Sequence, residues 1–92
     1  MLNAHQKGIL NDIIDAYKSG DMDLAESMVR AKGLRKGWSE KKMRKRTKWR
    51  RGAMKAWAVG QKIPFRPFGG AIVAAGQSVE KAVRLIQEQA NK

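Results

Sequence analysis

Cysteine is absent from this 92-residue chain, and histidine occurs once, at His5. The lack of cysteine excludes a disulfide framework, a thiolate nucleophile and any zinc or iron–sulfur site built from cysteine. A single histidine cannot complete a metal site, so we expect no cofactor. Long apolar runs are missing too, because the longest, residues 71–76, is far shorter than the roughly 18 to 20 residues that a membrane-spanning helix needs.

The first ten residues lack the continuous hydrophobic stretch of a signal peptide. We therefore expect a soluble, cytoplasmic protein, or one packaged within a nucleoprotein particle. The chain also lacks the usual signs of an enzyme. No pair of carboxylates has an evident reason for a shifted pKa, no serine or lysine has an activating partner, and the lone histidine has no orienting group.

Acidic residues are scarce, and the basic residues are unevenly distributed. The chain has 20 Lys and Arg against 8 Asp and Glu, a net charge of +12. Residues 1–30 carry −2, residues 31–68 carry +13 and residues 69–92 carry +1. A field concentrated in this way attracts anions, so the sequence predicts a polyanionic partner for residues 32–66.

The spacing of apolar residues predicts a single all-α domain over residues 1–92, with three or four helices. The first helix is expected over residues 3–18, ended by Gly20, and Asp21 is the expected N-cap of the second. Apolar positions of the first helix are Ile9, Leu10, Ile13, Ile14 and Tyr17. The second helix is expected to end near Lys32, stopped by Gly33. Its expected buried residues are Leu24, Ala25, Met28 and Val29. Residues 1–32 thus form an acidic helical hairpin.

Residues 33–60 are predicted to form a short basic connector and then a long basic helix, capped by Ser39 and ending near Val59. A narrow apolar stripe is expected at Met43, Thr47, Met54, Trp57 and Ala58. Cations on the opposite half of the helix are expected at Lys41, Arg44, Lys45, Lys48, Arg51 and Lys55. Gly52 is the weak point of this helix, because a glycine inside a helix costs about 1 kcal/mol relative to alanine.

Residues 61–70 contain both prolines and are predicted to form a loop. Residues 71–91 follow with helical spacing and predict a C-terminal amphipathic helix. The core of such a small chain is thin, so we expect a homo-oligomer or docking in a larger assembly. The expected contact residues on the C-terminal helix are Ile72, Val79, Val83 and Ile86.

The most informative feature is the cationic run, residues 41–51, in which eight of eleven residues are Lys or Arg. Like charges four residues apart oppose helix formation by a few tenths of a kcal/mol each, so the helix needs a counter-charge, which a row of phosphates supplies. The predicted nucleic-acid-binding residues are Lys41, Lys42, Arg44, Lys45, Arg46, Lys48, Trp49, Arg50, Arg51 and Lys55. They do not separate DNA from RNA.

Trp49 lies about 120° from the apolar stripe, among the cations. Two interpretations stay open: it stacks on an unpaired base, or it packs on the N-terminal hairpin or on a second copy of the chain. Trp38 and Trp57 are instead predicted to be core or staple residues. Arg50 falls close to the stripe and is expected to extend along it or to pair with an acid such as Asp12 or Asp15.

The acidic hairpin is expected to present a solvated face, although it also suits a contact with the basic helix or with another protein. The sequence as a whole predicts a non-enzymatic nucleic-acid-binding accessory protein. One alternative is a component of a larger assembly, or an inhibitor of a nucleic-acid enzyme, whose basic helix fills an acidic protein groove. A less favoured alternative is a basic amphipathic helix on an anionic membrane surface, because the apolar stripe is narrow.

Overall fold

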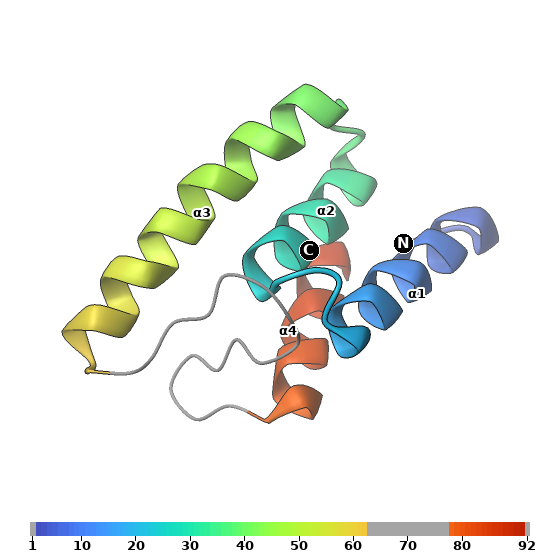
Figure 1. The fold of residues 1–92 in the computed structure, drawn as a ribbon. Helices are drawn as coiled ribbons and strands as arrows, with labels where there is room; N and C mark the ends of the chain where they lie inside the picture. Colours follow the sequence, from blue (N-terminus) through green and yellow to red (C-terminus); the bar gives the residue numbers. More distant parts are fainter. Residues whose placement is uncertain (1, 63–77, 92) are drawn as a thin grey trace.

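The computed structural model describes residues 2–62 and 78–91. Within these ranges the chain forms four α-helices and no strand (Figure 1). They are α1 (Ala4–Ser19), α2 (Leu24–Lys36), α3 (Glu40–Gly60) and α4 (Val79–Asn91). The predicted all-α fold is confirmed.

The ends of α1 follow directly from its flanking residues. Asn3 forms a capping box with Gln6: the Asn3 side chain accepts a hydrogen bond from the Gln6 amide at 2.8 Å, and the Gln6 side chain accepts one from the Asn3 amide at 3.0 Å. Gly20 closes the helix with φ of 89°, a conformation that costs a residue with a Cβ roughly 1 to 2 kcal/mol. The predicted bounds of the first helix are therefore correct to within one residue.

The N-cap of α2 is Asp23, so the prediction of Asp21 is wrong. The Asp23 carboxylate accepts a hydrogen bond from the Glu26 amide at 2.7 Å, whereas that of Asp21 accepts one from the Ser19 hydroxyl at 3.0 Å. The turn between α1 and α2 is two residues longer than predicted. As a result, the carboxylate that caps α2 is a buried one.

The prediction that Gly33 ends the second helix is also wrong, because α2 continues to Lys36 and ends at Gly37, where φ is 68°. Gly33 is buried inside α2. A Cβ at Gly33 would lie 2.7 Å from the Met43 sulfur and 3.2 Å from Cε3 of Trp38. The missing side chain thus lets α3 approach α2 closely, and residues 34–36 are helical and not a connector.

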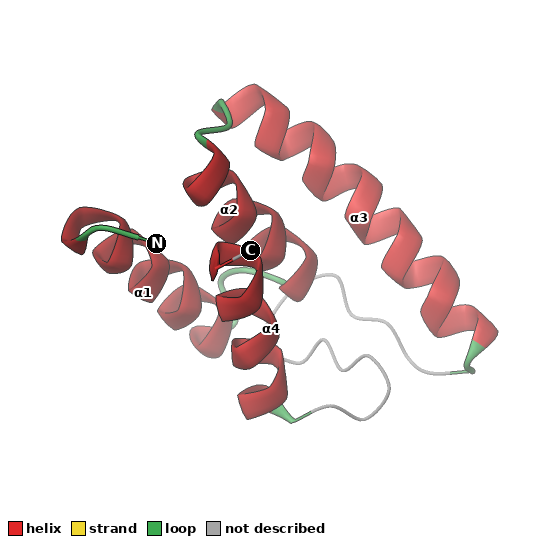
Figure 2. Cartoon of the chain, turned by 180° about the vertical axis from the view of Figure 1, so that it is seen from behind, coloured by secondary structure: helices red, strands yellow, loops and turns green. Residues whose placement is uncertain are grey.

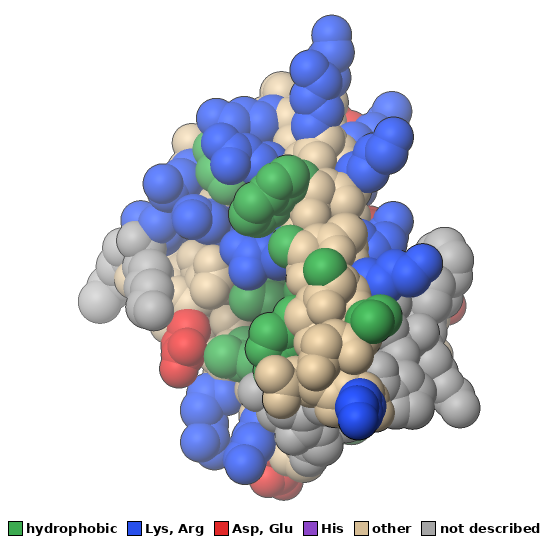
Figure 3. All heavy atoms as spheres, turned by 90° about the vertical axis from the view of Figure 1, so that its left-hand side faces the viewer, with side chains coloured by type: hydrophobic (Ala, Val, Ile, Leu, Met, Phe, Trp, Pro, Cys, Tyr) green, Lys and Arg blue, Asp and Glu red, His purple; other side chains and the backbone are tan. Residues whose placement is uncertain are grey.

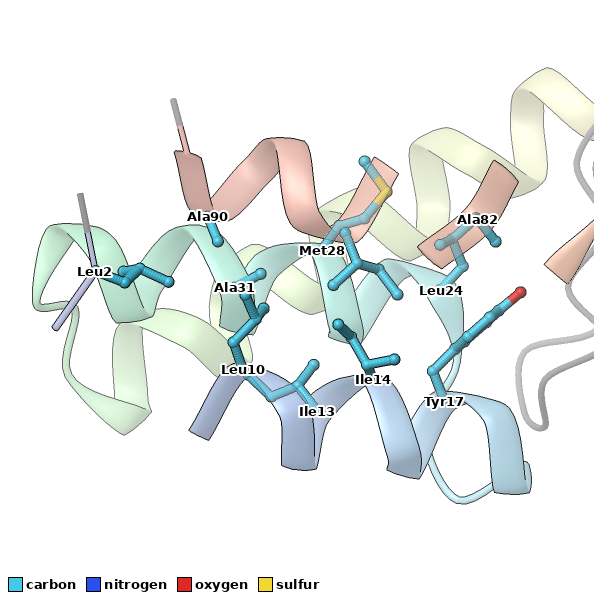
Figure 4. Packing of buried hydrophobic residues seen from close by; sticks show 11 residues of the cluster. Leu2, Leu10, Ile13, Ile14, Tyr17, Leu24, Met28, Ala31, Ala82 and Ala90 are labelled. Carbon is cyan, nitrogen blue, oxygen red and sulfur yellow. The ribbon is translucent and has the colours of Figure 1, made fainter. Parts of the chain in front are cut away.

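The hydrophobic core lies between α1, α2 and α4, with Tyr17 and Leu24 almost completely buried (Figure 4). Burial raises the pKa of the Tyr17 phenol above its usual value. Four of the five predicted apolar positions of α1 are buried, and Ile9 is partly so. The four residues predicted to be buried in the second helix are also in the core.

The position of α3 differs from that of the other helices. α2 contacts α1, α3 and α4, whereas α3 contacts only α2 among the described helices (Figures 1 and 2). Most of the circumference of α3 therefore faces away from the described helices, and the long basic helix lies along one edge of the molecule.

α4 packs part of its apolar face inside the molecule, so Ile86 is not the exposed contact residue that the sequence predicted. Ile86 is completely buried in the core and Val83 packs partly against it, while Val79 is 47% exposed. Ile72, with the rest of residues 63–77, lies outside the described residues. Among the helices of the described ranges, none is long and apolar enough to cross a membrane.

Candidate nucleic-acid interface

α3 is one continuous helix of 21 residues, about 30 Å long. Ser39 is its N-cap, as predicted, and its hydroxyl accepts a hydrogen bond from the Lys42 amide at 3.2 Å. The helix passes through Gly52 without a break. The cationic run is consequently presented on a single rod.

The inner face of α3 matches the predicted stripe except at Trp57. Thr47 and Ala58 are buried and Met54 is half-buried, but Trp57 is 44% exposed. The prediction that Trp57 belongs to the core is wrong. α2 has 13 residues against the 21 of α3, so it is about 12 Å too short to cover the whole of α3.

Acidic residues of α2 and α3 hold the two helices together through Arg30. The Arg30 guanidinium donates two hydrogen bonds to the Glu40 carboxylate, at 2.7 and 3.0 Å, and one to Glu26 at 2.8 Å. These bonds raise the pKa of Arg30 above its usual value. The hydrogen bond from Arg30 also lowers the pKa of Glu40.

Arg51 is the predicted site residue that the structure turns inward. Its Nε donates a hydrogen bond to the Asp23 carboxylate at 2.6 Å, and a second nitrogen lies 3.7 Å from Glu26. The Asp23 side chain is completely buried, and that of Arg51 is 31% exposed. The charge of Arg51 therefore already has a partner, which corrects its assignment to the outward half of the helix. Asp23 and Glu26 likewise do not belong to a solvated acidic face.

The remaining cations of the run have few or no acidic partners among the described residues. Arg44 lies 3.5 Å from Glu40, but its side chain is 76% exposed. Six others form no ion pair with any described residue: Lys41, Lys42, Lys45, Arg46, Lys48 and Arg50. The expected pairing of Arg50 with Asp12 or Asp15 is thus absent from the described part of the chain. Figure 3 shows Lys and Arg side chains gathered around exposed apolar side chains on this face.

On one side of α3 a small cleft separates it from α2. Its volume is about 40 Å³, room for about one or two water molecules. Two tryptophans and three cations line it, together with one valine of α2. They are Val29, Lys32, Trp38, Arg46, Trp49 and Arg50.

The two tryptophans of this cleft differ in what covers them. The Trp38 ring is half-buried, near Gly33, and two cations lie over it: Lys42 Nζ at 4.9 Å from the ring centroid and Arg46 Cζ at 5.4 Å. This position fits the prediction that Trp38 is a core or staple residue, since the ring packs near α2 and attracts the two cations through its face. Trp49 is 68% exposed, so it is not packed on the N-terminal hairpin within the described residues.

The cleft extends the basic surface onto α2. The charge of Lys36 lowers the pKa of Lys32, and Arg50, Arg35 and Arg46 add to that effect. Cations of both helices therefore lie close enough to repel one another around this cleft. Lys32 and Lys36 belong to the segment 32–66 that was expected to meet a polyanion, but they are not among the individual site residues predicted from the sequence. An unbroken helix to Gly37 places these two lysines one turn apart on the same face.

The described residues contain no group of three or more His, Cys, Asp or Glu side chains that would hold a metal ion. Comparison of the chain with protein-family profiles, curated proteins and solved structures finds no significant match.

Proposed function

We propose that this protein is a non-enzymatic nucleic-acid-binding accessory protein whose α3 contacts the phosphate backbone. The observation that carries the proposal is the set of six cations on the run that lack an acidic partner among the described residues. They belong to a helix that only α2 contacts among the described helices, so that a long polyanion has access to most of its surface.

The dimensions of α3 fit a short stretch of backbone. Eleven helical residues extend about 15 Å. One strand of a duplex carries a phosphate every 3.4 Å or so along the axis, which places about four or five phosphates beside the run. Each contact releases condensed counterions, so binding is expected to depend steeply on salt.

The exposed apolar residues of α3 argue against the membrane alternative. Trp49, Trp57 and Val59 are exposed, and at about 100° per residue Trp57 and Val59 lie about 80° on either side of Trp49, but they share this half of the helix with the exposed cations Lys42, Lys45 and Arg46. An interfacial helix needs these residues on one continuous face. The basic surface therefore suits phosphates along a strand better than the apolar boundary of a bilayer.

A salt-series titration tests the proposal. Labelled oligonucleotides, as duplex DNA, single-stranded DNA and RNA, are titrated with the protein at several salt concentrations. For about four phosphate contacts, the slope of log K against log salt is expected to lie near −3 to −4. Weak binding without a salt slope would overturn the proposal. Equal binding to anionic vesicles, or tighter binding to an acidic protein that survives nuclease treatment, would favour the alternatives.

A further inference from the structure

Trp49 is an exposed aromatic residue placed where cations of two helices meet. Trp49 is 68% exposed, and it lines the cleft with Lys32 of α2 and with Arg46 and Arg50 of α3. A large exposed tryptophan leaves apolar surface in water, which burial would relieve at roughly 25 cal/mol per Å². No described side chain provides that burial.

Two cations close to this cleft, Arg46 and Lys42, lie over the ring of the other tryptophan, Trp38. Within the described residues no cation lies over the ring of Trp49. Trp38 thus holds two cations in position, whereas the ring of Trp49 stays exposed beside them. The cleft itself is too small to enclose a base, so a ligand ring has to lie on the surface of Trp49.

We propose, on the basis of the function proposed above, that the cleft between α2 and α3 selects unpaired nucleic acid by stacking one base on Trp49. Lys32, Arg46 and Arg50 then contact the phosphates on either side of that base. A base in a duplex is stacked between its neighbours and cannot cover the indole without leaving the helix. A base in a single strand, a loop or a bulge is free to do so.

The test compares Trp49→Leu with the wild-type protein, and it uses Trp57→Leu as the matched control. Trp57 is a second exposed tryptophan of the same helix, eight residues away and outside the cleft. Affinities are measured for a non-self-complementary single strand, as DNA and as RNA, and for the corresponding duplex DNA. Far-UV circular dichroism and sedimentation establish that each variant keeps its helix content and association state.

We expect Trp49→Leu to weaken single-strand binding by about 5- to 150-fold, the usual effect of losing one stacked base. Duplex affinity is expected to change less than about twofold, and the salt slope is expected to stay the same because no charge is removed. Trp49→Phe, which keeps a ring, should restore part of the loss. Trp57→Leu should leave both affinities unchanged.

Three outcomes would overturn the inference. An equal loss of affinity for single strand and duplex would show that Trp49 does not distinguish unpaired from paired bases. The proposed function would still stand in that case, because the salt slope would remain. A change of association state in Trp49→Leu would show that a second copy covers this residue. Absence of a salt slope in the wild-type protein would instead remove the proposed function itself.

Discussion

Replacing Lys42, Lys45, Arg46 and Lys48 by glutamine is expected to weaken nucleic-acid binding at low salt by at least about 100-fold. All four side chains are exposed, and none has an ion pair within the described residues. If each contacts one phosphate, the salt slope should also become shallower by about 3. Glutamine favours the helix nearly as well as lysine and arginine, so α3 should persist.

The matched control removes the same net charge from other parts of the molecule. It replaces four exposed cations of α1 and α4 by glutamine: Lys7, Lys18, Lys81 and Arg84. If binding depends only on the total charge of the protein, both variants lose affinity equally. If α3 is the contact surface, the control keeps its salt slope and loses less than about tenfold in affinity. Equal losses would contradict the placement of the interface.

Arg51→Gln is expected to lower the free energy of unfolding by about 2 to 3 kcal/mol, although Arg51 belongs to the same cationic run. The substitution leaves the completely buried Asp23 carboxylate without the guanidinium 2.6 Å away. Breaking a buried pair by removing one partner costs about 3 to 5 kcal/mol, and the partial exposure of Arg51 reduces that figure. A domain of this size has a total stability of about 5 to 15 kcal/mol.

Chemical denaturation monitored by circular dichroism measures this effect. Arg44→Gln is the matched control, because it removes an exposed guanidinium of α3 that lies 3.5 Å from its acidic partner. Its expected effect is within about 0.5 kcal/mol. The double variant Asp23→Asn with Arg51→Gln should recover most of the loss, since the asparagine still caps α2 and no buried charge is left. An Arg51→Gln effect as small as that of Arg44→Gln would contradict this account of the α2–α3 contact.

Local signals in the sequence predicted the helices well. The apolar spacing of α1, the left-handed Gly20 and the capping Ser39 each act over a few residues, so they can be recognised without knowledge of the fold. Gly33 misled the prediction because a glycine inside a helix and a glycine that ends one look the same in sequence. What distinguishes them is the contact with Met43, ten residues away.

The ion pairs of the site were less predictable, because they also join residues that are far apart in the sequence. The pairing of Arg51 with Asp23 joins residues 28 positions apart, and the pairing of Arg30 with Glu40 depends on how α2 meets α3. A helical wheel orders the cations of α3 around its axis, but the position of the partner helix decides which of them are neutralised. For Trp49 the helical wheel gave the direction, about 120° from the apolar stripe, but it left open whether the ring is exposed or packs on another part of the protein; the structure leaves Trp49 68% exposed.

We expect the cations of α3 to bind phosphate, whereas those of α1 and α4 do not. Acetylation of lysines, followed by mass spectrometry with and without a saturating oligonucleotide, tests this claim most directly. We expect the oligonucleotide to protect the exposed lysines of the cationic run, namely Lys41, Lys42, Lys45 and Lys48. Lys7, Lys18 and Lys81, which are exposed on other helices, should react as before. Equal protection of both groups, or protection of neither, would contradict the account.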